Sequence, residues 1–179
     1  MASFVYAIPF GRGKRFGAHL PAVVDKVFAN WEVNGIVTYS TGTPLTFSAP
    51  NNTNADSSTQ RPNILRDAAL PGDRATPARL QQWFDTTAFA QPAAFTFGNA
   101  PRTLPDVRSD SLKNVDFSLF KEFPFLEHNT VQLRAESFNA FNTPQFGVPG
   151  TVLGASDFGV VNTQANNPRQ IQFGLRVIF

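Results

Sequence analysis

The closing segment of the chain is the feature that most constrains its fold. Over residues 169–179 the sequence reads RQIQFGLRVIF, in which apolar residues alternate with residues that are mostly polar. Because successive side chains of a strand point to opposite faces, this pattern predicts a strand with one apolar and one polar face. Its length matches the roughly 9–11 residues of a strand that crosses a bilayer at a tilt. The chain then ends on an aromatic residue, Phe179.

Composition limits how such a chain could meet a membrane. Hydrophobic residues make up 42% of the 179 residues, but no run reaches the roughly 18 apolar residues that a membrane helix needs. Any crossing would therefore be made by strands. The formal net charge is only +2 and no basic cluster stands out, so we expect no nucleic-acid partner. The absence of cysteine excludes a disulfide framework and a thiolate metal site.

The rest of the chain contains four more segments with strand patterns. We expect strands at about residues 3–9, 31–47, 113–123, 130–142 and 169–179. Short helices are indicated near residues 20–30 and 76–84, and a tight turn at 125–129. Two long stretches, 49–112 and 143–168, are rich in turn-forming residues, and such stretches are usually functional loops or disordered. The predicted fold class is all-β, an antiparallel meander of about five strands with two long loops.

The lengths of the connections favour a membrane barrel. Bacterial outer-membrane barrels have tight periplasmic turns and long external loops, and a periplasmic C-terminus would put both long stretches outside. The polar parity of the strands would then face the lumen and the apolar parity the lipid. The predicted lumen-facing residues, which could pair across the lumen, are Asp116, Arg134, Glu136 and Arg176. Candidates for aromatic girdles at the membrane interfaces are Trp31, Tyr39, Phe123, Phe125 and Phe179.

A soluble β-sandwich would show much the same alternation on its strands. The alternative prediction is therefore a soluble or surface-attached β-sandwich that acts as a binding or adhesion module. The unequal connections and the terminal phenylalanine favour the barrel.

No motif in the chain points to catalysis, a cofactor or a metal. Residues 11–14 (GRGK) lack the spacing of a phosphate-binding loop and are better explained as a turn. The two histidines lie far apart in predicted turns, and no serine has the surroundings of a nucleophile. Four aspartates of the first long stretch do not have the spacing of a calcium loop, and we expect them to be solvated; they are Asp56, Asp67, Asp73 and Asp85. We expect a protein that is not an enzyme.

Several sequence segments are more specific than an alternation of polar and apolar residues, and they resemble one family. The N-terminal phrases are FVYAIPFGRGK at 4–14, WEVNGIVT at 31–38 and TGTPLT at 41–46. They are followed, in the family's order, by WFDTTAF at 83–89, NVDFSLFK at 114–121, RAESFNAFNTPQFG at 134–147 and NPRQIQFG at 167–174. Together they resemble the late strands of TonB-dependent outer-membrane transporters, and most closely the Oar-like subgroup.

The resemblance implies a barrel of about 22 strands with a plugged lumen, of which this chain would supply the last five or so. Because no signal peptide, plug or TonB box is recognisable, we expect the chain to be a fragment of a longer parent protein in the bacterial outer membrane. Its expected role is to complete the barrel wall and to present external ligand-contacting loops. Expected partners are outer-membrane lipid, the barrel-assembly machinery, the rest of the barrel and the TonB complex. The expected assembly signal comprises Phe173, Leu175, Val177 and Phe179.

Overall fold

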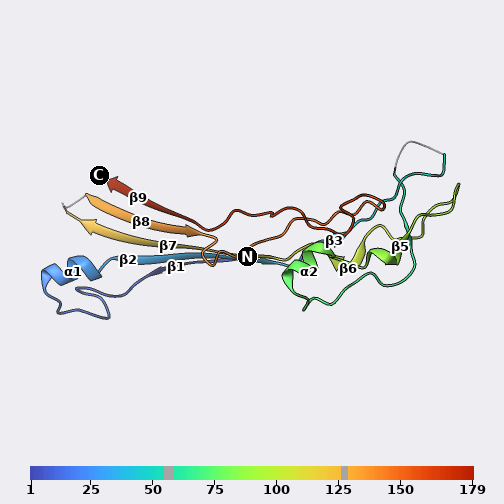
Figure 1. Cartoon of the computed structure of the whole chain (residues 1–179). Helices are drawn as coiled ribbons and strands as arrows, with labels where there is room; N and C mark the ends of the chain where they lie inside the picture. Colours follow the sequence, from blue (N-terminus) through green and yellow to red (C-terminus); the bar gives the residue numbers. More distant parts are fainter. Residues whose placement is uncertain (55–58, 126–128) are drawn as a thin grey trace. The chain divides into compact units, whose positions relative to one another are not determined.

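The computed structural model describes residues 1–54, 59–125 and 129–179, which form two compact units (Figure 1). The first, called the sheet unit below, comprises Met1–Ser40, Leu112–Pro144 and Asn167–Phe179. The second, called the loop unit, comprises Thr41–Ser111 and Gln145–Asn166. The chain therefore leaves the sheet unit twice, and both excursions belong to the same loop unit.

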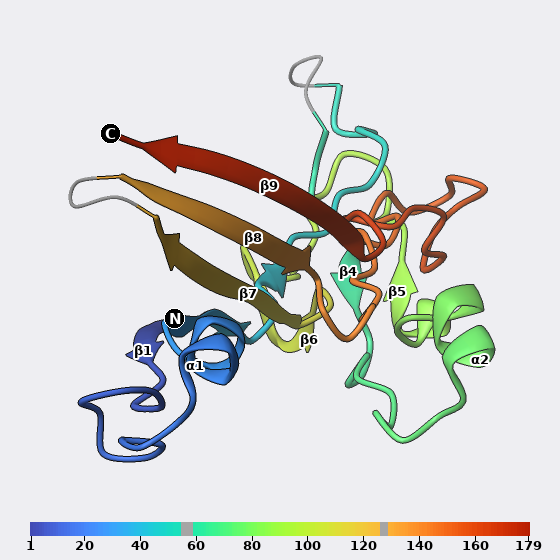
Figure 2. The same ribbon diagram turned by 90° about the vertical axis from the view of Figure 1, so that its left-hand side faces the viewer.

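The sheet unit is built on one antiparallel sheet of five strands, which confirms the predicted all-β meander (Figure 2). The strands are β1 (Ala2–Ala7), β2 (Trp31–Ser40), β7 (Leu112–Pro124), β8 (Thr130–Phe138) and β9 (Gln170–Ile178). They pair in the order β1-β2-β7-β8-β9, so the strands of this unit are neighbours in the sheet in the same order in which they follow one another along the chain. The predicted strands over 3–9, 113–123 and 169–179 correspond to β1, β7 and β9 with ends shifted by one or two residues.

Two of the predicted strands were too long. The strand expected over 31–47 ends at Ser40, and Pro44–Leu45 forms a separate strand, β3, that pairs with another part of the chain. The strand expected over 130–142 ends at Phe138. There Asn139 and Asn142 adopt left-handed backbone conformations with φ of 49° and 51°, which a strand cannot accommodate.

The connection between β1 and β2, residues 8–30, is folded rather than extended. It contains a glycine-rich turn and the helix α1 (Ala22–Phe28), in the place where a short helix was expected. The backbone N–H of Arg12 donates to Oδ1 of Asp25 at 2.6 Å, which ties the turn to the helix. None of the helices among the described residues is long and apolar enough to span a membrane.

The connection between β7 and β8 falls on the predicted turn at 125–129. Residues 126–128 lie outside the described residues. At the base of the turn, the N–H of Phe125 donates to the carbonyl of Asn129 at 3.1 Å. The described residues on either side thus bring the two strands together where the sequence predicted a turn.

The loop unit shows that residues 49–112 and 143–168, expected to be long loops with one short helix, carry more regular structure than the sequence indicated. It contains four short strands in two pairs: β3 with β6 (Leu104–Arg108), and β4 (Asn63–Ile64) with β5 (Phe89–Ala90). The helix α2 (Thr76–Gln81) and the 3-10 turn η1 (Thr86–Ala88) complete it. The helix confirms the one indicated near residues 76–84.

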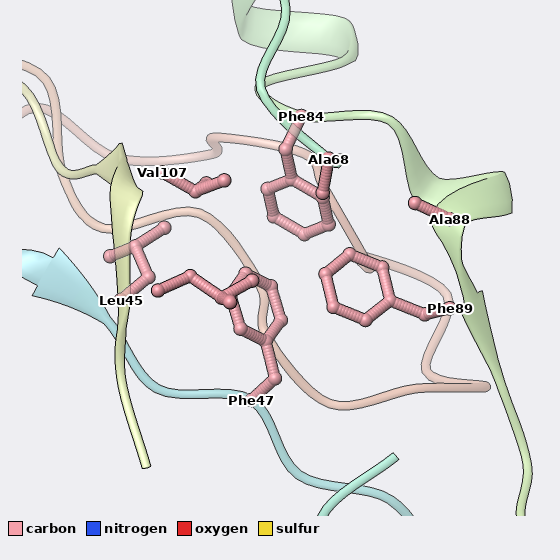
Figure 3. Packing of buried hydrophobic residues seen from close by; sticks show 8 residues of the cluster. Leu45, Phe47, Ala68, Phe84, Ala88, Phe89 and Val107 are labelled. Atoms are coloured by element: carbon pink, nitrogen blue, oxygen red, sulfur yellow. The ribbon is translucent and has the colours of Figure 1, made fainter. Parts of the chain in front are cut away.

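A phenylalanine cluster forms the core of the loop unit (Figure 3). Its rings are those of Phe47, Phe84, Phe89 and Phe158, and every pair of them lies within 6.5 Å between centroids. Most of the pairs are edge-to-face, an arrangement that the ring quadrupoles favour. The side chain of Phe84 is completely buried. Aliphatic residues around the rings, among them Leu45 and Val107, complete the cluster.

Backbone hydrogen bonds join the two segments of the loop unit. The N–H of Leu153 donates to the carbonyl of Ser48 at 2.8 Å, and the N–H of Trp83 donates to the carbonyl of Gly159 at 2.7 Å. Phe158 of the second segment belongs to the aromatic cluster of the first. The two long connections therefore share one core and one hydrogen-bond network.

Candidate functional site

The sheet has one polar and one apolar face, as the alternation predicted. The register places Arg134 opposite Phe120 on β7 and Gly174 on β9, and Gln132 opposite Arg176. Because faces alternate along each strand, the residues predicted to line the lumen share one face of the sheet; they are Asp116, Arg134, Glu136 and Arg176. That this face borders a lumen stays a prediction.

On the polar face, the charged side chains of Arg134 and Glu136 contact neutral groups rather than opposite charges. Nε of Arg134 donates to Oε1 of Gln132 at 2.7 Å, and the guanidinium lies 4.7 Å from the ring centroid of Phe120. Glu136 accepts a hydrogen bond from Gln172 on the adjacent strand. Among the described residues the structure places no ion pair among the four predicted lumen residues. The register puts glycine opposite Arg134 on β9. Pairing of these residues across a lumen stays a prediction.

Asp116 has a local structural role on the same face. Its Oδ1 accepts hydrogen bonds from Nδ2 of Asn114 and from the backbone N–H of Asn139, each at 2.9 Å. Asn139 in turn donates through Nδ2 to the carbonyls of Thr143 and Asn167 at 3.1 Å. Asp116 therefore anchors the turn that ends β8.

The opposite face carries large apolar side chains, many of them exposed. Gly35 of β2 makes room for the ring of Phe4, because a Cβ atom at this glycine would lie 2.4 Å from that ring. On β9 the predicted assembly-signal residues Phe173, Leu175 and Val177 share this face, and Phe179 follows the strand. All four are exposed in the chain. A contiguous apolar surface of this kind marks contact with lipid or with protein.

Most of the predicted girdle aromatics lie at one end of the sheet. Trp31 begins β2, and Phe123 lies near the end of β7, at the same end of the sheet. β9 also ends there, and Phe179 follows its last residue. Tyr39 lies at the other end of β2. The distribution agrees with two belts of aromatic residues at the two interfaces of a membrane.

The loop unit contains an open cavity of about 290 Å³. Three arginines and a tryptophan from the region around α2 and β6 contribute to its wall; they are Arg74, Arg79, Trp83 and Arg108. The guanidinium of Arg79 lies 4.8 Å from the ring centroid of Trp83 and 3.8 Å from Oδ1 of Asp110. The indole N–H of Trp83 donates to the carbonyl of Arg108 at 2.7 Å. These contacts orient the ring and hold positive charge beside it.

A second polar cluster of the loop unit surrounds Asp85. Its Oδ1 accepts from the hydroxyl of Thr87 at 2.6 Å and from the N–H of Thr87 at 3.0 Å, and its Oδ2 lies 3.0 Å from the guanidinium of Arg66. The hydroxyl of Thr87 first, and then its backbone N–H and Arg66, hold the pKa of this carboxyl below its usual value. The cluster closes the turn η1 and supplies no nucleophile.

The other described residues that were considered for metal or phosphate binding do not form a site. Asp56 and His128 lie outside the described residues. The remaining aspartates do not converge, and no group of three or more metal-ligating side chains occurs within residues 1–54, 59–125 and 129–179. Residues 11–14 form a turn closed by a hydrogen bond from the N–H of Lys14 to the carbonyl of Gly11 at 3.1 Å.

Comparison with known proteins identifies the class of this sheet. The sequence profile of the family described as "Outer membrane beta barrel domain" matches residues 1–172, and the chain belongs to this family. It is therefore a component of the bacterial outer membrane, with the five-stranded sheet as barrel wall, and not the β-sandwich considered as the alternative. No curated protein and no solved structure matches the chain.

Sequence reasoning missed the core and the cavity of the loop unit. The available signal was the phenylalanines in otherwise polar stretches, such as Phe47, Phe84 and Phe158. They lie too far apart to make a periodic pattern. Only the tertiary structure shows that they meet.

Proposed function

We propose that this chain is the C-terminal part of the wall of a TonB-dependent, Oar-like transporter, and that it has no catalytic activity. It supplies five strands of wall and a folded surface that contacts the transported ligand. The parent protein takes up a bulky nutrient, with energy from an inner-membrane complex acting through TonB. The phrases between residues 4 and 174 that resemble this subgroup support the proposal.

The observation that carries the proposal is the loop unit. Both long connections leave the sheet at the same end, since β2 and β8 run in one direction and β7 and β9 in the other. A shared core would serve no purpose if the connections only tethered one strand to the next. It does serve a binding surface, because a preorganised site loses less entropy when it binds. The buried phenylalanine cluster and the bonds between the two segments support a ligand-contacting role.

The cavity beside Trp83 is the proposed place of ligand contact. Arginine donors suit carboxylate or phosphate groups, and the tryptophan face suits a flat apolar group or a sugar ring. Two acidic residues, Asp106 and Asp110, also line the cavity, so it offers acceptors as well as donors.

The sheet edges support the proposal that further strands of the parent complete the wall. Among the described strands, β1 and β9 each pair on one side only. An unpaired backbone edge is not tolerated in hydrocarbon, so a barrel must close. In the proposed parent, strands that precede β1 close the ring against β9.

The proposal is tested on the full-length protein. We expect the reading frame that carries this chain to encode, before residue 1, a plug and a TonB box. We also expect the immobilised periplasmic domain of TonB to retain the purified protein, and a version without the plug to pass through. An upstream frame that encodes only an unrelated protein, or equal behaviour of the two versions on the TonB column, would contradict transport through TonB.

The proposed assembly signal has a separate test. Deletion of Phe179 is expected to lower the amount of protein in the outer membrane, because the barrel-assembly machinery would lose the terminal aromatic residue it reads. The measurement is heat-modifiable migration of the protein in outer-membrane fractions. Phe141→Ala changes an exposed phenylalanine of the same unit and is the control. Equal amounts of the deletion variant and the unmodified protein in the outer membrane would show that Phe179 is not part of the assembly signal.

A further inference from the structure

The connection between β1 and β2, residues 8–30, lies against the apolar face of the sheet. The indole N–H of Trp31, which is on that face, donates to the carbonyl of Val27 at 2.9 Å. Lys121 is on the same face and donates through Nζ to the carbonyl of Ala29 and, at 3.0 Å, to that of Glu122. The connection therefore folds toward the apolar face of the sheet and not toward the polar face.

This contact explains how a lysine is accommodated on the apolar face. The side chain of Lys121 is only 2% exposed, although its neighbours on the face are aromatic. Its ammonium group lies 4.4 Å from the ring centroid of Phe123 and 5.9 Å from that of Trp31. Cation–π contacts, the carbonyl of Ala29 at the end of α1 and the carbonyl of Glu122 in β7 replace the water that the charge has lost. The connection is thereby tied to the sheet.

The connection exposes apolar side chains that no other described residue of the chain covers. Val23 is 77% exposed, and Val27 follows one helical turn later on the same side of α1. None of the residues of α1 is buried. An open groove of about 670 Å³ continues from the connection onto the sheet, and residues of both parts line it, among them Phe16 and Phe4. The apolar surface of the connection thus continues that of the barrel wall.

The same connection carries an excess of positive charge. It contains four basic residues (Arg12, Lys14, Arg15 and Lys26) against a single acidic one, Asp25. Asp25 is engaged by the N–H of Arg12. A segment with exposed apolar side chains and surplus basic residues suits the boundary between headgroups and acyl chains, and it is attracted to anionic lipid.

We propose that the connection is an interfacial anchor that lies in the headgroup layer of one leaflet and binds anionic phospholipid. Val23 and Val27 enter the upper acyl region, and Lys14 and Lys26 contact phosphate groups. The connection leaves the sheet at the end where β9 stops, which is the periplasmic end under the loop-length rule. The anchor requires only that the sheet is barrel wall, and it does not depend on ligand uptake.

The depth of the anchor can be measured with one probe. The chain contains no cysteine, so Val23→Cys provides a unique thiol within it for a bimane label. The full-length protein is reconstituted in bilayers of phosphatidylcholine with phosphatidylglycerol. We expect strong quenching by phosphatidylglycerol that carries a spin label near the carboxyl end of its acyl chain, and weak quenching by iodide. Val148→Cys, at a residue of the loop unit that is 63% exposed, is the control and should show the reverse.

The lipid preference is tested by reversing charge. Lys14→Glu combined with Lys26→Glu should lower the association of spin-labelled phosphatidylglycerol with the protein roughly tenfold, with phosphatidylcholine unchanged. Arg61→Glu combined with Arg102→Glu makes the same charge change at exposed residues of the loop unit and should have no effect. Heat-modifiable migration verifies that each variant is folded. If the glutamate pair does not fold, Lys14→Gln with Lys26→Gln replaces it.

Each outcome decides the proposal. Quenching of the Val23→Cys label by lipid, together with loss of phosphatidylglycerol preference in the lysine variant, would support it. Strong quenching by iodide would place the connection in water, and protection from both quenchers would mean that a protein covers it. Quenching by lipid together with an unchanged phosphatidylglycerol preference in the lysine variant would show that Lys14 and Lys26 do not bind an anionic headgroup. Any of these last three results would overturn the proposal.

Discussion

The aromatic core of the loop unit predicts that one phenylalanine supports the folding of both long connections. Phe84 is completely buried, and its ring centroid lies 4.9 Å, 5.6 Å and 5.2 Å from those of Phe47, Phe89 and Phe158. Replacing a buried phenylalanine by alanine costs about 3–5 kcal/mol. A unit of about 90 residues has a stability of about 5–14 kcal/mol. Phe84→Ala should therefore remove a large fraction of the stability of the loop unit.

Hydrogen exchange measures this loss where the two segments meet. The reporters are the amides of Trp83, Leu153 and Val161, each of which donates to a carbonyl of the other segment. A loss of about 4 kcal/mol corresponds to an increase in their exchange rate of roughly a thousandfold, provided that exchange requires opening of the unit. Amides of the β8–β9 ladder should keep their rates. The protein stays in its bilayer throughout the measurement.

The matched control for this experiment is Phe97→Ala. Phe97 belongs to the same unit but is 79% exposed, so its removal should change the stability by no more than about 0.5 kcal/mol. If Phe84→Ala accelerates exchange at the reporter amides by less than about tenfold, the aromatic cluster does not hold the segments together. Equal effects of the two variants would also refute the reasoning, because burial would then not decide the result.

Two further predictions concern the same unit. Gly42→Ala should disrupt the β3–β6 pair at a cost of about 1–3 kcal/mol or more, because the added Cβ atom would lie 1.8 Å from the carbonyl oxygen of Ser109. Gly72→Ala, at a glycine with open space around it, is the control. Equal hydrogen-exchange rates of the loop unit in the two variants would contradict this prediction. Because its bonds to Thr87 lower the pKa of Asp85 in the folded protein, the carboxylate contributes stability above its unfolded pKa of about 3.8, and this contribution is lost as the pH falls through the folded value. Denaturant titrations of the loop unit at a series of acidic pH values should show this loss, and Asp85→Asn should abolish it; the same pH dependence in the variant would rule out Asp85 as its source.

The alternating strands were predictable because their signal is local. β7 and β9 lie within one or two residues of their predicted positions, since period-2 alternation depends only on neighbours along the chain. The end of β2 was not predictable in this way. Leu45 and Phe47 continue the alternation past Ser40, but they belong to the core of the loop unit. A pattern shows that a segment can have an apolar side, and it does not show against what that side packs.

The end of β8 illustrates a second limit. The apolar residues Ala140 and Phe141 follow Phe138 and suggest that the strand continues. The chain turns instead, because Asn139 adopts a left-handed conformation and its N–H and side chain are held by Asp116, Thr143 and Asn167. Asp116 and Asn167 come from other segments of the chain. Propensity alone could not rank this turn above a longer strand.

The sequence by itself determined the two-faced strands and their meander, because both depend on periodicity over short windows. Only the tertiary structure decided that two apparently irregular stretches share a phenylalanine core. It alone also shows that Lys121, on the apolar face, is held by the carbonyl of Ala29 from the β1–β2 connection. The physical reason is the same in both cases. Contacts between residues many positions apart depend on register and on how loops close, and neither leaves a repeating pattern in the sequence.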